Sequence, residues 1–486
     1  MKYIFSLQLF FLLFSFQLKS QHSSDIYSRV QKLNVLGSLL HIGAHPDDEN
    51  TSLISYFSNK YHIETTYLSI TRGDGGQNRI GTELRDGLGL IRTQELLAAR
   101  KIDGANQLFT TANDFGFSKH PDETLNIWNK NELLSQVVKH IRTIQPDIII
   151  NRFDHRTPGK SHGHHTSSAI LGLEAYKLSS DVNYFPEQLK FLSVWKPKRL
   201  FLNVSWYFYG SQENFNKIKK NEFLKFDHSE FNSLIGLTYD QIAAKSRSQH
   251  KSQGFGRSPN PGGPQWGYLE LIKGDLISSN NPFEGIDVSW NRLKGGEKIE
   301  NLINKLLTDF DFEFPEKNLS ALLNIYENIE SLDNGYWRNL KLREVKKIIS
   351  LCLGLNIQLN SESILGTPGS KETLNLKIVN PSNAKILFEN IAINNVVFQI
   401  DSILTNNTLF EKKLDIYLKD QISSPYWLIK DIGIGMYNVE KDHLKGLPET
   451  PSPVEAKLKV EINGTKLSMI FSANNRDTDP VKGEVV

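Results

Sequence analysis

The chain has 486 residues, of which 39% are hydrophobic and 23% are charged. Its 56 basic and 54 acidic residues almost balance, and no long basic run occurs, so the charge pattern indicates neither a nucleic-acid partner nor an anionic membrane surface. The length exceeds that of one ordinary domain, and we expect two or three.

The N-terminus predicts a secretory signal peptide. Lys2 precedes an apolar stretch from Ile4 to about Leu18, and Ser20 is a small residue before a polar region. The stretch is short for a membrane span, which needs about 20 residues; an uncleaved anchor is the alternative. We therefore expect residues 1–20 to be removed, no stable membrane span to remain, and the protein to be exported, to the periplasm or beyond the cell.

Strands and helices alternate between residue 21 and about residue 275. Apolar and β-branched runs predict strands at residues 35–44, 63–71, 106–111, 147–153 and 199–206. Apolar residues at helical spacing predict helices at residues 82–100, 132–144 and 166–179. This alternation is typical of an α/β fold in which helices cover both faces of a parallel sheet.

The rest of the chain changes character twice. Residues 276–354 are predicted to form a helical linker region, and residues 355–486 a β-sandwich-like region of short alternating strands. We expect this β region to be incomplete or to belong to a longer architecture. The only cysteine, Cys352, cannot form an intrachain disulfide and lies in an apolar context, so we expect it in a core.

The stretch LLHIGAHPDDEN, residues 39–50, brings chemistry to the end of a predicted strand. Ligands of open parallel sheets bind outside the carboxyl ends of the strands. His45 and Asp48 are three residues apart, so one turn of chain can bring both to one zinc ion. Asp47 would project differently and could face a metal-bound water. The alternative is a helix N-terminus, with Pro46 in the first turn and the acids complementing the dipole.

A second loop leaves the strand at residues 147–153 and should open on the same edge of the sheet. It carries four histidines before the next helix, namely His155, His162, His164 and His165. Histidine clusters in loops are ordinary metal donors, although a solvated surface loop is the alternative.

These residue types together fit hydrolysis. Three protein ligands leave a coordination position for a water molecule, whose pKa the metal lowers to about 7. A free carboxylate can take the proton as a general base. A histidine that is not a ligand can stabilise an oxyanion or protonate a leaving amine.

The motifs AHPDDE (residues 44–49) and HGHH (residues 162–165) resemble those of the PIG-L/LmbE family of zinc-dependent N-deacetylases. TRGDGGQN (residues 71–78) and RTQELLAA (residues 92–99) extend the resemblance in the same order, over about residues 33–205. The resemblance implies a Rossmann-like deacetylase domain at residues 21–275, a Zn²⁺ cofactor (or another divalent metal) and an amino-sugar or glycan substrate.

The resemblance also assigns roles to single residues. It implies His45, Asp48 and His165 as metal ligands, Asp47 as the general base and His162 as the histidine that assists the tetrahedral intermediate or the leaving amine. The family's second loop usually reads His-Pro-Asp-His, and here Gly163 and His164 replace its middle pair. We therefore place His164 behind the ligands and take Asp154 as the nearest substitute for an orienting carboxylate.

The other motifs are less specific. TRGDGGQN follows a strand, which makes Arg72 and Asp74 candidate contacts for substrate hydroxyls; a plain glycine-rich turn is the alternative. Arg79 and Arg85 are equally available for substrate binding. In SRSQHKSQGFG (residues 246–256), Arg247, His250 and Gln253 are candidates for a cleft rim, and a solvated loop is the alternative for each.

The sequence therefore predicts an exported zinc-dependent hydrolase that removes N-acetyl groups from an N-acetylglucosamine-type sugar or glycoconjugate. One alternative is hydrolysis of another small N-acyl amide, and the other is a non-catalytic glycan-binding protein. The presence of Asp47 beside the ligands favours the enzyme, because a binding site would not need a free base.

Overall fold

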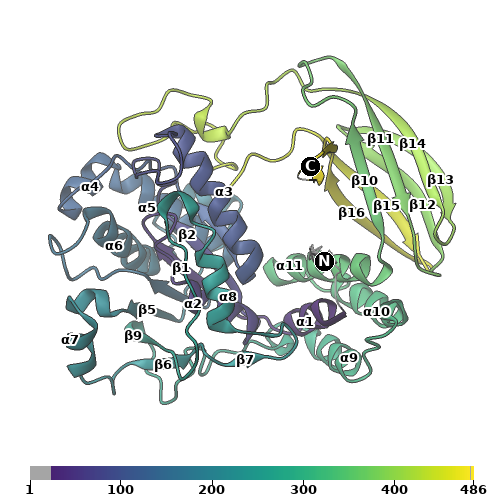
Figure 1. Cartoon of the computed structure of the whole chain (residues 1–486). Helices are drawn as coiled ribbons and strands as arrows, with labels where there is room; N and C mark the ends of the chain where they lie inside the picture. Colours follow the sequence, from purple (N-terminus) through teal and green to yellow (C-terminus); the bar gives the residue numbers. More distant parts are fainter. Residues whose placement is uncertain (1–22, 482, 486) are drawn as a thin grey trace, which may run out of the picture.

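The computed structural model describes residues 23–481 and 483–485 (Figure 1). The predicted signal peptide, residues 1–20, lies outside these ranges. Figure 1 shows an α/β part and, beside it, a part made of helices and antiparallel strands. None of the described helices is long and apolar enough to cross a membrane.

The α/β part is built on one seven-stranded sheet. Across the sheet the strands are β3 (Asn106–Phe109), β2 (Glu64–Ser69), β1 (Ser38–Gly43), β4 (Ile148–Asn151), β5 (Arg199–Val204), β9 (Trp266–Gly274) and β6 (Leu224–Asp227). The first five run parallel to their neighbours, whereas β9 is antiparallel to both β5 and β6. The sheet is therefore mostly parallel, in agreement with the α/β fold that the sequence predicts.

Helices cover both faces of this sheet because its central strands are apolar on both sides. In β1, Leu39 packs into the core on one face, and Leu40 and Ile42 pack into the core on the other. The first face is covered by α2 (Thr51–Asn59), α3 (Asp86–Asp103) and α8 (Tyr239–Arg247), and the second by α4 (Pro121–Ile127), α5 (Lys130–Ile144) and α6 (Gly163–Leu178).

Several strands end at the same edge of the sheet. The carboxyl ends of the parallel strands β1, β4 and β5 share it. Since β9 runs the opposite way, its beginning lies there too: Tyr268 pairs with Val204 of β5, and Trp266 pairs with Asp227, the last residue of β6. Loops from five strands can therefore contribute to one site.

The second part has its own core. The helices α1 (Ser23–Leu33), α9 (Gly296–Thr308), α10 (Leu319–Glu330) and α11 (Tyr336–Leu353) share it with two antiparallel sheets. One sheet is β10 (Asn356–Ser361), β11 (Lys371–Val379) and β14 (Leu409–Tyr417); the other is β13 (Val396–Leu404), β12 (Ile386–Ile393), β15 (Glu455–Ile462) and β16 (Thr465–Ser472).

This second core agrees with the predicted helical region and β-sandwich. It also contains Cys352, which is buried as predicted. The helix α1, which we assigned to the first domain, contributes Ile26 and Val30 to this second core. The domain boundaries after residues 275 and 354 stay a prediction.

The segment between β14 and β15, residues 418–454, returns to the α/β part, and we call it the returning segment. Figure 1 shows it as the yellow-green loop near α3 and α5. Its backbone bonds to the chain that follows β3: the N–H of Asn113 donates to Gly435, and the N–H of Tyr437 donates to Thr111. Tyr426, Trp427 and Tyr437 form a small buried cluster there.

The remaining short elements connect these layers. They are α7 (Gln212–Lys217), β7 (Phe231–Asn232), β8 (Leu237–Thr238), β17 (Asp477–Asp479), β18 (Gly483–Val485) and the 3-10 helices η1 (Pro186–Lys190), η2 (Trp206–Tyr209), η3 (Lys251–Gln253), η4 (Trp290–Arg292), η5 (Pro315–Asn318) and η6 (Tyr426–Leu428).

Candidate metal centre and adjoining cleft

The turn after β1 folds around the carboxylate of Asp48. This carboxylate accepts hydrogen bonds from the backbone N–H groups of Ala44 (3.1 Å) and His45 (2.7 Å), and lies 3.1 Å from Nδ1 of His45. Asn50 then caps α2, because its side-chain oxygen accepts from the N–H groups of Ser52 and Leu53. The acids therefore lie in a short structured turn between β1 and α2.

The histidine loop joins this turn through the start of α6. His162 caps the helix, since its Nδ1 accepts from the N–H of His164 at 3.1 Å. His164 and His165 then occupy the first turn. His164 Nδ1 lies 3.0 Å from His45 Nε2, and His165 Nε2 lies 3.5 Å from a carboxylate oxygen of Asp48.

Two overlapping groups of side chains could hold a metal ion, and each offers ligand atoms within 4.8 Å of one another. One group is His45, Asp48 and His165, the set that we predicted from the sequence, and the other is His45, His162 and His164. The first combines a carboxylate with imidazoles, a donor set that suits Zn²⁺.

The donor set of the first group fits a divalent cation. It offers a carboxylate and two imidazoles with ligand atoms within 4.8 Å of one another, and His165 Nε2 lies 3.5 Å from a carboxylate oxygen of Asp48. The buried nitrogens without a hydrogen-bond partner in the described part of the chain are the opposite ones, His165 Nδ1 and His164 Nε2.

Burial and neighbouring charges set the pKa values of the first group. Burial lowers the pKa of His165 to about 3, which keeps its imidazole neutral. Burial opposes ionisation of Asp48, but His165 and His45 hold its pKa well below the usual range. Burial would also lower the pKa of His45, yet Asp48 raises it to about 9, so a cation that binds there must displace a proton.

Asp47 belongs to neither metal group. Its φ of 123° is in a region that non-glycine residues rarely adopt, and its carboxylate lies 2.9 Å from Nη2 of Arg92 on α3. Arg247 donates to its carbonyl oxygen. Burial raises the pKa of Asp47, against the lowering by Arg92. Asp47 therefore lies outside both ligand groups, and it lines the cleft described below.

Glu49 is committed to a buried network. Its Oε1 accepts from Arg100 (3.2 Å) and faces Nε2 of His250 at 2.7 Å, while its Oε2 accepts from the N–H of Asp47 at 3.0 Å. Burial opposes its ionisation, but His250 and Arg100 hold its pKa below the usual range. Glu49 thus fixes the turn, and His250 lies in the interior rather than at a cleft rim.

Asp114 is a neighbour of the centre that the sequence reasoning missed. It follows β3, and its carboxylate oxygens lie 3.7 Å from Nδ1 of His164 and 3.9 Å from Nε2 of His45. Asp74 fixes this position, since its carboxylate accepts from the N–H of Asp114 at 3.0 Å. The signal that could have found Asp114 is the one used for His45, a polar residue shortly after a predicted strand.

The structure separates the four predicted substrate-binding residues from the cleft. Arg72 has no exposed surface: it donates to Leu447 and Pro448 of the returning segment, and its guanidinium lies 3.4 Å from the ring of Trp427. Asp74 is also buried. Arg79 and Arg85 are exposed, but neither lines the cleft. Residues far along the chain cover Arg72 in this structure, and its role as a substrate contact stays a prediction.

Two further predicted residues have other partners. The carboxylate of Asp154 pairs with Arg156 (2.8 Å), which also pairs with Glu270. In this structure the carboxylate of Asp154 is engaged by Arg156 and does not orient the metal ligands. His164 is fully buried between aromatic side chains, with ring centroids 4.4 Å from Trp128 and 4.5 Å from Phe115.

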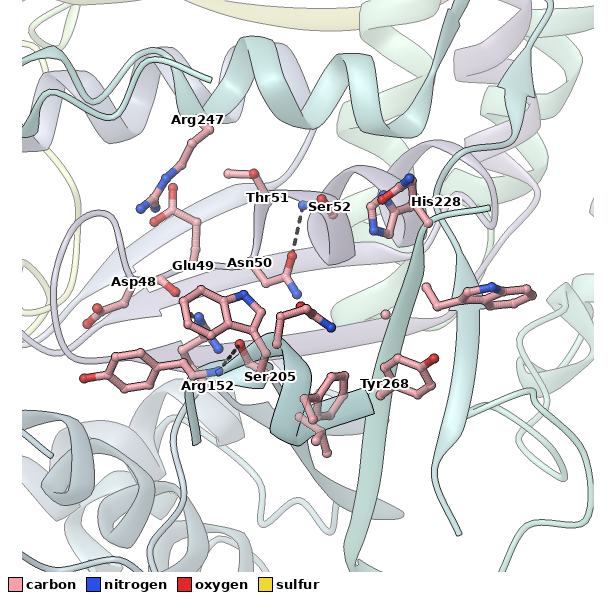
Figure 2. A pocket seen from close by; sticks show the side chains of 18 of the residues that line it. Asp48, Glu49, Asn50, Thr51, Ser52, Arg152, Ser205, His228, Arg247 and Tyr268 are labelled. Carbon is pink, nitrogen blue, oxygen red and sulfur yellow. Dashed lines mark hydrogen bonds between the residues drawn. The ribbon is translucent and has the colours of Figure 1, made fainter. Parts of the chain in front are cut away.

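A cleft of about 940 Å³ opens beside the centre. Figure 2 shows Asp48, Arg152 and Ser205 near one end and His228 and Tyr268 towards the other. From the centre, the cleft is lined by Asp47, Asp48 and His165, whereas His162 is not among its lining residues. Arg247 lines the cleft as well, which agrees with the prediction of a cleft rim for residues 246–256.

A family model described as PIG-L, GlcNAc-PI de-N-acetylase, matches residues 40–176. Residues 40–176 are a PIG-L domain. The PIG-L domain contains His45, Asp48 and His165, whereas the cleft-lining residues from Val204 to Tyr268 lie beyond it. The family consists of metal-dependent de-N-acetylases, in agreement with the resemblance seen in the motifs.

No curated protein matches the chain. Among solved structures, the N,N'-diacetylchitobiose deacetylase from Pyrococcus horikoshii is 19% identical, over 46% of this chain and 73% of that one, with a TM-score of 0.33. The hydratase GalB from Pseudomonas putida is 14% identical, over 50% of this chain and 99% of that one, with a TM-score of 0.32. The conserved protein TT1542 from Thermus thermophilus is 18% identical, over 44% of this chain and 79% of that one, with a TM-score of 0.28. Scores this low carry no conclusion about the PIG-L domain.

Proposed function

We propose that this protein is an exported, zinc-dependent N-deacetylase that removes the acetyl group from an N-acetylglucosamine-type sugar or glycoconjugate. The observation that supports it most is a division of roles within one turn. His45 and Asp48 join His165 in a metal-ligand group, while Asp47 stays outside this group and lines the cleft.

A divalent cation held by His45, Asp48 and His165 would polarise the amide carbonyl and lower the pKa of a water molecule. Asp47 is the carboxylate placed to take the proton of that water. Glu49, its neighbour, is not available, because both of its oxygens are engaged with the buried network. We therefore assign the role of general base to Asp47.

His162 is proposed to donate a hydrogen bond. Its ring lies next to His45, with centroids 5.3 Å apart. Burial lowers its pKa to about 4, so the imidazole is neutral near pH 7. Since its Nδ1 accepts from the N–H of His164, we assign the proton to Nε2. This Nε2–H could donate to the developing oxyanion or to the leaving nitrogen.

The proposal of export rests on the predicted signal peptide, and the proposal of zinc rests on the donor set. The test is acetate release by the purified, zinc-loaded protein from a panel of N-acetylated amino sugars and their glycosides. We expect release by the unaltered protein and a loss of about 10²-fold or more for Asp47→Asn, with the zinc content unchanged. A zinc-loaded protein that binds these sugars but releases no acetate would instead be a glycan-binding protein.

A further inference from the structure

The cleft extends well beyond the metal centre. It follows the edge of the sheet at which the carboxyl ends of β1, β4 and β5, the beginning of β9 and the end of β6 meet. At about 4.8 Å between neighbouring strands, the four steps from β1 to β6 span about 19 Å. A single acetamido sugar would fill only the part nearest Asp48.

The cleft presents aromatic side chains to solvent, both after Ser205 and at the beginning of β9. Trp206 and Tyr207 lie on η2, directly after β5, and Trp266 begins β9; their exposed fractions are 49%, 51% and 45%. All three line the cleft. Large rings gathered in a concave surface mark a binding site, because leaving so much apolar area in contact with water is unfavourable unless a ligand covers it.

The cleft also presents uncharged polar groups. Ser205, Gln212, Asn216 and Gln265 line it, and they offer hydroxyl and amide groups. The ammonium of Lys220, another lining residue, lies over the rings of Phe215 and Tyr268. The guanidinium of Arg257, which also lines the cleft, is already paired with Asp240. Flat apolar rings beside neutral hydrogen-bonding groups suit a ligand with apolar ring faces and hydroxyl edges, which is the chemistry of a sugar chain.

We infer that this cleft binds an oligosaccharide, with the acetamido sugar that reacts at the metal centre and further sugar units over Trp206, Tyr207 and Trp266. The inference rests on the proposed deacetylase function and specifies its substrate as a chain rather than a monosaccharide. The three rings lie outside the PIG-L domain, so these subsites are built from η2 and β9, which follow that domain in the chain.

The test measures binding separately from catalysis. Zinc-loaded Asp47→Asn protein is titrated by calorimetry with N-acetylglucosamine and its β-1,4-linked oligomers from dimer to pentamer. We expect the Kd to fall by about tenfold or more between monomer and tetramer, since each added contact of about 1.4 kcal/mol corresponds to a factor of ten. A Kd that does not change with chain length overturns the inference.

Variants then locate the subsites. Trp266→Ala and Trp206→Ala, each in the Asp47→Asn background, should remove most of the gain in affinity with chain length. Phe191→Ala is the matched control, because Phe191 is 89% exposed and does not line the cleft. Thermal melting of each variant establishes that it is folded. Equal tetramer affinity in the Trp266 variant, the Trp206 variant and the control contradicts the inference.

Acetate release by the unaltered protein separates the two proposals. Release that is independent of chain length, together with constant affinity, sustains the deacetylase and overturns the extended cleft. Tight binding of oligomers without any release of acetate sustains the extended cleft and overturns the deacetylase.

Discussion

The Nη2 atom of Arg92 lies 2.9 Å from the carboxylate of Asp47, so α3 holds the proposed base from outside the metal-ligand group. The same guanidinium donates to the carbonyl oxygens of Pro46 and Gly73. It therefore ties the turn after β1 to the turn after β2. A planar group with several fixed donors can do this, and a lysine cannot do all of it.

Arg92→Met should lower kcat by about 10- to 100-fold, because Asp47 loses the group that orients it. The KM and the zinc content should change little, since Arg92 neither lines the cleft nor belongs to the ligand groups. Arg92→Lys should recover part of kcat. A parallel loss of zinc and thermal stability, with no recovery by lysine, would show that Arg92 only supports the fold.

Metal content should distinguish the two ligand groups, which share His45. Asp48→Asn and His165→Ala each remove a ligand of the first group, and we expect them to lower zinc affinity by more than the roughly 10- to 100-fold typical of a lost neighbouring partner. His164→Ala should stay within that smaller range. Zinc bound per protein after dialysis against a weak chelator gives the answer, and retention of zinc by His165→Ala would favour His45, His162 and His164.

The sequence could predict that the two loops meet because the rule behind this is local: polar residues in the loops that follow parallel strands meet at one edge, and His45, Asp48 and His165 do so. The choice of His165 among the four histidines of the second loop came from the family resemblance. The fate of Arg72 could not be predicted in this way. The burial of Arg72 depends on the carbonyls of Leu447 and Pro448, about 375 positions further along the chain. No pattern in the sequence near Arg72 predicts that a segment returns from the second part of the chain.

The aromatic cleft was beyond sequence reasoning for a similar reason. It requires the antiparallel strand β9, whose direction places Trp266 beside the end of β6. No strand is predicted from the sequence at residues 266–274, and a strand parallel to β5 would have had its beginning at the opposite edge.

Stability should fall as the pH is lowered because some histidines are buried in the neutral form. Burial lowers the pKa of His140 to about 4, from an ordinary 6.5, and burial likewise lowers that of His41 to about 4. Below pH 6.5 these histidines bind protons in the unfolded chain but stay neutral in the folded chain. Stability is therefore full above pH 6.5 and falls towards pH 4, by roughly 2 kcal/mol for each histidine at pH 5.

Urea unfolding of the unaltered protein and of His140→Gln at pH 8, 6 and 5 checks this. The Nε2 atom of His140 lies 2.8 Å from the carbonyl oxygen of Phe109, and the glutamine amide can still donate to this oxygen. The variant should lose less stability than the unaltered protein between pH 8 and pH 5. Identical losses would mean that His140 does not contribute to the pH dependence.

The returning segment should depend on the burial of Arg72. The guanidinium lies close to the rings of Trp427 (3.4 Å) and Phe109 (4.2 Å) and donates to Tyr426 and Leu447. Arg72→Met leaves these acceptors without their donor, which costs about 1–3 kcal/mol for each buried group. We expect a lower melting temperature and faster proteolytic cleavage within residues 418–454.

Arg79→Met is the control for this last prediction, because Arg79 is exposed and directly follows the same motif. Its melting temperature should equal that of the unaltered protein. Trp427→Ala should reproduce the effect of Arg72→Met, since it removes the other half of the stacked pair and leaves a cavity, at about 3–5 kcal/mol. If Arg72→Met and Arg79→Met are cleaved at the same rate, Arg72 does not hold the returning segment.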